Sequence, residues 1–387
     1  MEDVNNPADR HPETPRPATG GARVVIAPDS FKGTFDADAA AELIGAGVRE
    51  VLPDAEITLA PMADGGEGTA ARFTGETVTL PTTDAAGRLT EAAYVYDAAA
   101  ATAYIDVAAA SGLPAVADRP VPLTGDTYGT GVLIADARTR GAQRVVLALG
   151  GSGTVDGGSG ILVALGARLL DRRGLPVPKG GGWLSAVESV DTARLNTDAG
   201  AMEFVLLTDV TAPVTGPEGA ARVFGPQKGA AADDVELLDE SLAHLCKVLE
   251  FDPTTPGAGA AGGVPVCLTW LARLLGNPDP RILPGAPVVA ASLGLEDAVA
   301  SADLVITGEG SLDAQSFTGK VVGTLAGLER AEGAHLAVVC GRADAAARGA
   351  LPAGSLVEET GSKDADALRA AGARVAEAYR KISTVQG

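Results

Sequence analysis

Cysteine, histidine, aromatic residues and positive charge are all scarce in this sequence. Its 387 residues include three cysteines and three histidines, aromatic residues make up 4%, and the formal net charge is −20. So acidic a chain repels phosphate backbones and anionic membranes, which argues against nucleic acid or a membrane as its partner. No apolar run reaches the roughly 18 residues of a membrane span, and the N-terminus lacks the apolar segment of a signal peptide. We therefore expect a cytoplasmic protein.

The few cysteines and histidines also exclude several kinds of site. Cys246, Cys267 and Cys340 are scattered and form no CxxC pair, which is typical of buried thiols in a reducing compartment rather than of a disulfide framework. None of the three histidines falls in a glycine-rich segment. Neither a zinc site nor a histidine-dependent catalytic triad is therefore expected.

Apolar runs alternate with helical patterns along a chain whose length favours two domains. Residues 22–30, "ARVVIAPDS", precede a helical pattern over residues 36–53, and "ADLVI" at residues 302–306 precedes a helix predicted around residues 321–328. Such alternation predicts α/β layers around a largely parallel sheet. Residues 94–112 contain two strand-like runs in succession, which indicates a second α/β or α+β domain inserted into the first.

Five segments that follow apolar runs are rich in glycine, acids and, in several cases, lysine. They are "PDSFKGT", "MADGGEGT", "LGGSGTVDGG", "TDVTAPVTGPEGAARVFGPQKG" and "TGEGSLDAQSFTGK". Ligands of open α/β sheets bind beyond the carboxyl ends of the strands, where glycines let amides approach a phosphate and carboxylates can hold Mg²⁺. The chain has only seven lysines, yet Lys32, Lys228 and Lys320 all lie in these segments, which indicates an anionic ligand.

Each of these signals has a purely structural alternative. Glycines after strands commonly form turns. Four acids in the segments can instead cap the helices that follow, namely Asp64, Glu67, Asp156 and Asp209. Two familiar nucleotide-binding motifs are absent. The Gly-Lys pair at residues 319–320 precedes a valine rather than the serine or threonine of a Walker loop. The segment "GAGAAG" at residues 257–262 matches the Rossmann fingerprint but follows prolines rather than a strand.

Together, the segments resemble the bacterial glycerate kinase family of the first type. The resemblance spans about residues 23–375 and is carried by "IAPDSFKGT", "MADGGEGT", "LGGSGTVDGG", "TDVTAPVTGPEGAARVFGPQKGA", "PGAGAAGG" and "DLVITGEGSLDAQSFTGK", in the family's order. The family usually has alanine and asparagine where this chain has Gly153 and Val155. It usually has cysteine and asparagine where this chain has Thr208 and Ala212. Positions 155 and 212 therefore carry no polar side chain here.

The resemblance implies an architecture of two α/β domains with the active site in the cleft between them. One domain is flavodoxin-like, with a mostly parallel sheet, and is discontinuous in sequence; the other is inserted into it. For this chain that implies residues 22–78 plus 285–387 for the first domain and residues 79–284 for the inserted one. Residues 1–21 hold little to bury and several prolines, so they are expected to form a disordered tail.

The implied reaction transfers the γ-phosphate of ATP to D-glycerate in the presence of Mg²⁺ and gives 2-phosphoglycerate or 3-phosphoglycerate. The enzyme is expected to be a monomer or a homodimer. Asp209 or Asp313 would accept the proton of the substrate hydroxyl or bind the metal, and Lys320 would hold the transferring phosphate. Ser30 and Lys32 would bind the glycerate carboxylate. The remaining implied residues are Asp64, Gly65, Gly66 and Glu67 for the substrate, and Gly150, Gly151, Ser152, Asp156, Lys228 and Glu309 for the nucleotide.

Other functions stay open on the sequence alone. Another small-molecule kinase, or a nicotinamide-dependent oxidoreductase, could use a similar sheet, and a small-anion binding protein without turnover could use the same loops. The oxidoreductase would need a strand before "GAGAAG". ATP consumption with and without D-glycerate separates all three from a glycerate kinase.

Overall fold

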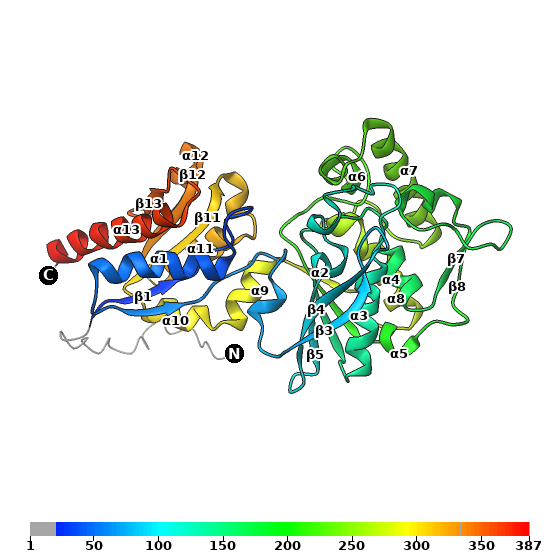
Figure 1. Cartoon of the computed structure of the whole chain (residues 1–387), viewed down its shortest axis with the longest axis horizontal. Coiled ribbons are helices and arrows are strands. Elements are labelled where there is room, and N and C mark those ends of the chain that lie inside the picture. The colour runs from blue at the N-terminus through cyan, green and yellow to red at the C-terminus, as the bar shows by residue number, and fades with distance from the viewer. Residues whose placement is uncertain (1–20, 333, 387) are drawn as a thin grey trace, which may run out of the picture.

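The computed structural model describes residues 21–332 and 334–386 and has two lobes that lie side by side (Figure 1). Each lobe is built around one central sheet, and the predicted α/β fold is confirmed. Of the predicted tail, residues 1–20 lie outside the described residues. In the part of the chain that the structure describes, none of the helices has the length and apolarity that a membrane span requires.

One lobe contains a five-stranded sheet in the order β13-β12-β11-β1-β2. Its strands are β1 (Arg23–Ile26), β2 (Glu56–Leu59), β11 (Leu304–Leu312), β12 (His335–Ala343) and β13 (Leu356–Glu359). All neighbours are parallel. When the strands are numbered within this lobe alone, their order is that of the flavodoxin-like fold. In this fold the direction of winding reverses between the strands that are β1 and β11 here.

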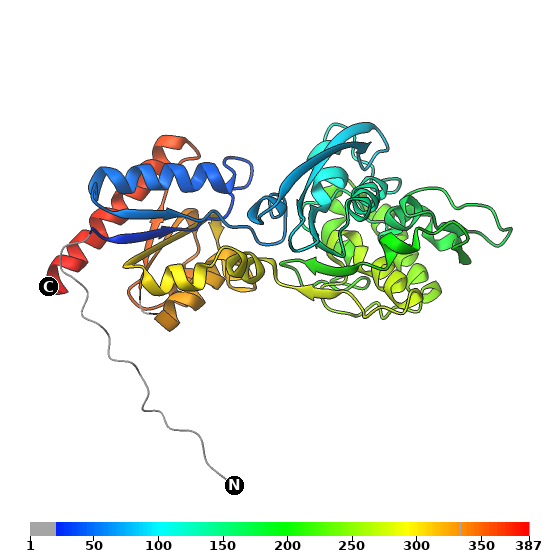
Figure 2. The same cartoon turned by 90° about the horizontal axis from the view of Figure 1, so that it is seen from below.

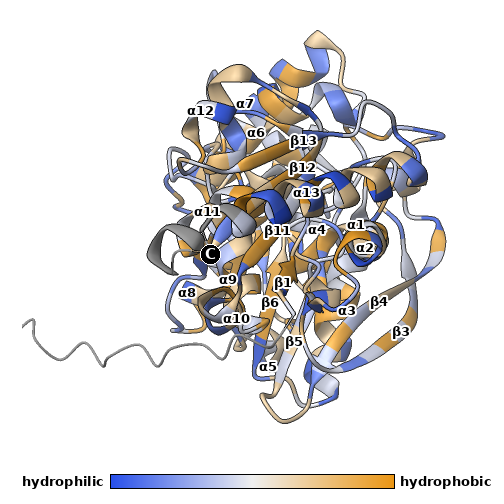
Figure 3. Cartoon of the chain, turned by 90° about the vertical axis from the view of Figure 1, so that its left-hand side faces the viewer, coloured by the Kyte–Doolittle hydropathy of each residue, from blue (hydrophilic) through white to orange (hydrophobic). Residues whose placement is uncertain are grey.

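Helices cover both faces of this sheet. They are α1 (Ala37–Val51) and α13 (Ala365–Gln386) on one face and α9 (Gly285–Ser292), α10 (Leu295–Ser301) and α11 (Val321–Glu332) on the other, with α12 (Ala345–Ala350) after β12. Val24 and Ile26 of β1 pack toward α1 and α13, while Val25 packs toward the other helices, as the alternation of a strand requires. Figure 3 shows the resulting hydrophobic centre, with β1 and β11 coloured as apolar.

The other lobe contains a six-stranded sheet in the order β10-β9-β6-β5-β4-β3. The strands are β3 (Glu76–Thr83), β4 (Leu89–Asp97), β5 (Thr102–Asp106), β6 (Arg144–Ala148), β9 (Glu203–Leu207) and β10 (Arg281–Leu283). The strands from β10 to β5 are parallel, whereas β4 pairs antiparallel with both β5 and β3. The two strand-like runs predicted within residues 94–112 are thus confirmed as an antiparallel pair.

Short helices and one hairpin complete this lobe. The α-helices are α2 (Val107–Ser111), α3 (Tyr128–Thr139), α4 (Ser159–Ala164), α5 (Thr197–Gly200), α6 (Ala220–Phe224), α7 (Ala232–Val248) and α8 (Val264–Leu274), and the hairpin is β7 (Arg168–Leu170) with β8 (Ser189–Asp191). The 3₁₀ helices of the chain are η1 (Ala70–Arg72), η2 (Pro114–Val116), η3 (Gly181–Ala186), η4 (Pro226–Lys228), η5 (Ala260–Gly262) and η6 (Ala314–Phe317). The lobe encloses the largest of the hydrophobic cores in the described residues.

The chain crosses between the lobes twice, once between β2 and β3 and once between β10 and α9 (Figure 2). The two crossings touch: a Cβ on Gly285 would lie 2.2 Å from the carbonyl oxygen of Asp64. Phe73, on the first crossing, stacks on Tyr104 of β5 with ring centroids 4.0 Å apart, which fixes this crossing to the six-stranded sheet. We propose that the crossings mark the domain boundaries, which the sequence predicts near residues 78 and 285.

Replacing Gly285 with alanine is expected to lower the free energy of unfolding by about 1–3 kcal/mol, because the new methyl group meets backbone atoms of Asp64 and Gly65 that cannot move aside. The matched control is Gly327→Ala in α11, where an added Cβ meets nothing within 4 Å. There the change should stabilise the helix by roughly 0.5–1 kcal/mol. Urea unfolding of both variants checks the difference; equal midpoints would contradict the close contact of the crossings.

Candidate functional site

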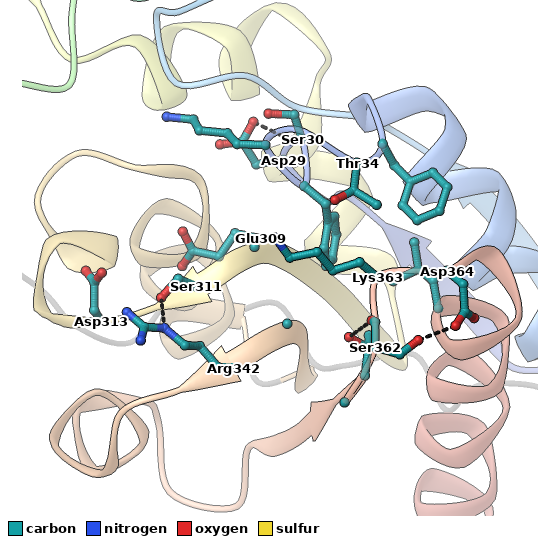
Figure 4. Close-up of a pocket in the computed structure, with 18 of the residues that line it drawn as sticks. Asp29, Ser30, Thr34, Glu309, Ser311, Asp313, Arg342, Ser362, Lys363 and Asp364 are labelled. Carbon is teal, nitrogen blue, oxygen red and sulfur yellow. Dashed lines mark hydrogen bonds between the residues drawn. The ribbon is translucent and has the colours of Figure 1, made fainter. Parts of the chain in front are cut away.

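A cleft of about 530 Å³ opens at the carboxyl ends of β1 and β11, where the winding of the five-stranded sheet reverses (Figure 4). Ligands of doubly wound sheets bind at this position. Six residues predicted for the site line it together, namely Ser30, Lys32, Asp64, Glu309, Asp313 and Lys320. The lining also includes the ends of β12 and the connection between β13 and α13, which the sequence analysis did not single out.

Three carboxylates gather at one end of the cleft. Asp29 is 8% exposed and Asp64 is 6% exposed. Burial and the charge of Asp64 raise the pKa of Asp29 to about 7. Burial and the charge of Asp209 raise the pKa of Asp64, and burial, with Asp313 and Asp64 adding to it, raises the pKa of Glu309. Asp64 Oδ2 and Glu309 Oε1 are buried and have no hydrogen-bond partner among the described residues. These acids would accept a bound cation.

The buried carboxyl of Asp29 should make stability depend on pH. Its pKa is about 7 in the folded chain against an ordinary value of 3.8, so its contribution to stability is complete below pH 3.8 and is lost as pH rises through 7. The Asp29→Asn variant should therefore lose less stability than the parent chain between pH 5 and pH 8. Urea unfolding at both pH values measures this, and identical pH slopes for the two chains would contradict it.

Lys320 and Asp209 face each other across the two lobes. Lys320 lies directly before α11 in one lobe, Asp209 follows β9 in the other, and Lys320 Nζ is 3.2 Å from Asp209 Oδ2. Burial alone would lower the pKa of Lys320, but the charges of Asp209 and Asp64 outweigh it and raise that pKa. A cation at the N-terminus of a helix opposes the helix dipole. The position of the Lys320 ammonium is therefore explained by a role in the cleft rather than by the stability of α11.

Asp313 lies at the edge of the cleft, where β11 ends. The apolar run that predicts this strand stops at residue 306, but β11 continues to Leu312, because Ser311 and Leu312 still pair with Arg342 and Ala343 of β12. Asp313 Oδ1 accepts a hydrogen bond of 2.9 Å from the backbone N–H of Gln315 and so caps η6. One of its oxygens is thus already engaged.

Glycines bring the loop after β2 and the loop after β6 into backbone contact. The N–H of Gly150 donates to the carbonyl of Gly65 over 2.9 Å, and a Cβ on Gly150 would lie 2.6 Å from Cα of Gly66. Gly65 has a φ of +104°, which favours glycine. The predicted residues Gly65, Gly66 and Gly150 therefore meet, and Gly151 lies beside Ala108 and the exposed Glu67.

Asp106 positions the loop after β2, and sequence reasoning missed it. Asp106 is the last residue of β5, and its carboxylate accepts hydrogen bonds of 2.8 Å from the N–H groups of Gly68 and Ala70. Burial raises its pKa to about 6. The sequence did contain a signal, because Asp106 follows the apolar run of β5 as the predicted acids follow theirs, but no glycine-rich segment accompanies it.

Ser152, Asp156 and Lys228 lie inside the six-stranded lobe and line no part of the cleft. Lys228 Nζ donates to Ser152 Oγ over 2.9 Å and to the carbonyl of Thr154 over 2.7 Å, and burial lowers its pKa to about 7. Asp156 is 0% exposed and accepts hydrogen bonds from Thr127 and from the first turn of α4. These contacts hold the loop after β6; a nucleotide role for the three residues stays a prediction.

Comparison with known proteins gives a consistent result. Residues 24–385 match the model of the glycerate kinase family. The chain is 41% identical to a glycerate kinase of Bacillus subtilis strain 168 over 308 residues, covering 77% of this chain and 79% of the relative. It is 39% identical over 309 residues to the glycerate 2-kinase of Escherichia coli K12, covering 77% and 80%. A crystal structure described as glycerate kinase 2 from Salmonella typhimurium LT2 superposes with a TM-score of 0.74 at 34% identity, covering 95% of this chain and 98% of that one.

Proposed function

The chain belongs to the glycerate kinase family, and we propose that its cleft transfers the γ-phosphate of ATP to the 2-hydroxyl of D-glycerate, giving 2-phosphoglycerate. ATP-dependent phosphorylation of glycerate is the activity of the named relatives, and this chain is an enzyme of that kind. The name of the Escherichia coli relative supports the 2-position. A nicotinamide fingerprint is not favoured, because "GAGAAG" contains the 3₁₀ helix η5 and follows residues that form no strand.

The ion pair between Lys320 and Asp209, beside the buried acids of the cleft, is the observation that carries this proposal. Phosphoryl transfer needs positioning and charge neutralisation more than covalent chemistry. Lys320 would hold the transferring phosphoryl group with its ammonium. Asp209, 3.2 Å from that ammonium, would accept the proton of the attacking hydroxyl and orient Lys320.

Glycerate would bind at the end of the cleft that holds the acids. The pKa of both Asp29 and Asp64 is raised, and the charge of Lys32 partly offsets that rise, so Lys32 lies near both carboxyls. With Ser30 it would bind the carboxylate of the substrate. The hydroxyls would then point toward Asp209 and Lys320, with the backbone of Gly65 and Gly66 alongside.

The residues present fit a Mg²⁺ ion, although no group of three or more histidine, cysteine or acidic side chains within residues 21–332 and 334–386 is arranged to hold a metal. Mg²⁺ commonly uses only one or two carboxylates and takes its other ligands from phosphates and water. Asp64 Oδ2 and Glu309 Oε1 are buried and unpaired, so they are the best candidates. When bound, the ion would neutralise phosphate charge. Asp209 and Asp313, the metal residues implied by the resemblance, already engage Lys320 and Gln315.

The test is an ADP-release assay with D-glycerate, with L-glycerate and without either acid. We expect ADP release that depends on D-glycerate. Phosphorus NMR of the product then fixes the position, because phosphate on the 2-hydroxyl couples to a single proton and gives a doublet, whereas the 3-hydroxyl gives a triplet. ADP release that does not depend on glycerate would overturn the function, and a triplet would overturn the 2-position.

The buried, free cysteines support our placement of the enzyme in the cytoplasm.

A further inference from the structure

The cleft extends beyond the end that holds the three acids and that we assign to glycerate. We call the remaining part the outer wall: Phe35, Ser311, Arg342, the connection of residues 360–364, and Leu368 of α13. The whole cleft measures about 530 Å³, within the roughly 300–1,000 Å³ of pockets that take drug-sized ligands. A small acid such as glycerate would fill only part of it. Figure 4 shows Arg342 and Ser362 on the far side of Glu309 from Asp29 and Ser30, with Lys363 extending toward Glu309.

Four cations line the cleft beside five carboxylates, in a protein whose net charge is −20. Three of the seven lysines line it, Lys32, Lys320 and Lys363, together with Arg342. Arg342 Nε donates to Ser311 Oγ over 3.0 Å. In the described part of the chain, neither Arg342 nor Lys363 forms an ion pair with a carboxylate, whereas many of the other arginines do. Two such cations at the mouth of a cleft suit a polyanion.

The outer wall also offers apolar surface and hydroxyl groups. The half-buried side chain of Phe35 lines the cleft, in a loop closed by a backbone hydrogen bond of 2.9 Å from Phe31 N to Phe35 O. Phe31 and Leu368 also border this space but are buried in the core behind it. Ser362 and Thr360 lie beside them. The acid of this wall, Asp364, is occupied, because it accepts hydrogen bonds from Ala367 N and Ser362 Oγ.

We propose that the outer wall binds the nucleotide. The triphosphate would pass between Arg342 and Lys363 toward Lys320, and the base and ribose would lie against Phe35. This inference rests on the proposed function and deepens it, because it assigns the two substrates to opposite ends of one cleft. It replaces the loop after β6 as the nucleotide site, since the polar side chains of that loop are buried in contacts with Lys228 and Thr127.

Titration calorimetry with ADP, in the absence of glycerate, tests the two cations. Arg342→Ala and Lys363→Ala should each weaken ADP binding by about 10-fold, as expected for loss of a hydrogen bond to a charged group, while KM for glycerate stays unchanged. The matched control is Lys381→Ala, which removes an exposed lysine from the far end of α13. Unchanged ADP affinity in both cleft variants, or a rise in KM for glycerate alone, would overturn the proposal.

Photolabelling locates the base independently. With 8-azido-ATP and peptide mapping, we expect the label on residues 31–35 or 360–368. A label on residues 150–156 or 209–230 would overturn the proposal. The two proposals can fail separately: a chain that binds ADP through Arg342 and Lys363 yet never phosphorylates glycerate would overturn the function alone, whereas a glycerate kinase whose label falls in the six-stranded lobe would overturn the nucleotide site alone.

Discussion

Replacing Lys320 with alanine is expected to lower kcat/KM for glycerate by ~10²-fold or more, a loss of about 3 kcal/mol of transition-state stabilisation. The ammonium is the cation that joins the two lobes at the cleft, 3.2 Å from Asp209, and it would lie against the transferring phosphoryl group. The fold should persist, because a cation before α11 opposes the helix dipole and its loss does not weaken the helix. Steady-state kinetics and thermal melting on the same preparation measure both effects.

Two further variants sharpen this test. Lys247→Ala removes an exposed lysine from the last turn of α7 and should leave the kinetics unchanged. Lys320→Arg keeps the charge but spreads it over a planar group, so it should recover only part of the activity. If Lys320→Ala turns over glycerate at the parental rate, or loses activity only in proportion to lost folded protein, the site is misplaced.

The Asp209→Asn variant should lower kcat by ~10²-fold or more, the range expected for loss of a general base. Asparagine has nearly the same shape but cannot accept a proton or balance Lys320. The matched comparison is Asp313→Asn. Asp313 caps η6 by accepting a hydrogen bond from Gln315 N, and an asparagine oxygen can accept the same bond, so we expect a much smaller loss.

The comparison of these two variants decides between the acids that the sequence left as alternatives. Rates across pH 6 to 9 and melting temperatures should be measured for both. If kcat falls more in Asp313→Asn than in Asp209→Asn while both proteins stay folded, the proton acceptor is Asp313 at the end of β11 rather than Asp209 in the ion pair between the lobes.

The sequence predicted the kind of fold better than its boundaries. Alternation of apolar runs and helical patterns is local, so it reveals α/β layers and the paired runs that became β4 and β5. The end of β11 is not local: Ser311 and Leu312 are strand residues because β12, some thirty residues further along, supplies their partners. Hydropathy stops at residue 306 and carries no information about that pairing.

For the site, the rule that ligands bind after strands selected segments that line the cleft, but it did not tell which of their side chains reach it. The presence of lysine in a glycine-rich segment selected Lys32 and Lys320, which line the cleft. The same rule selected Lys228, whose ammonium is buried against Ser152. Arg342 and Lys363 escaped notice because their segments have no such composition. The accessibility of a side chain depends on contacts between segments that are far apart in sequence, which no local pattern encodes.

The neighbour of β1 in the five-stranded sheet, β11, follows it by about 280 residues, and the hydrogen bond from Arg23 N to Asp303 spans that separation. During synthesis, the first two strands therefore leave the ribosome long before the strand that completes their sheet exists. The six-stranded lobe is continuous in sequence and can fold in the meantime, since domains generally fold as units. Until β11 emerges, β1 lacks one of its two neighbouring strands. We therefore expect this enzyme to depend on chaperones, or on the pace of translation, more than a chain with its two domains in tandem.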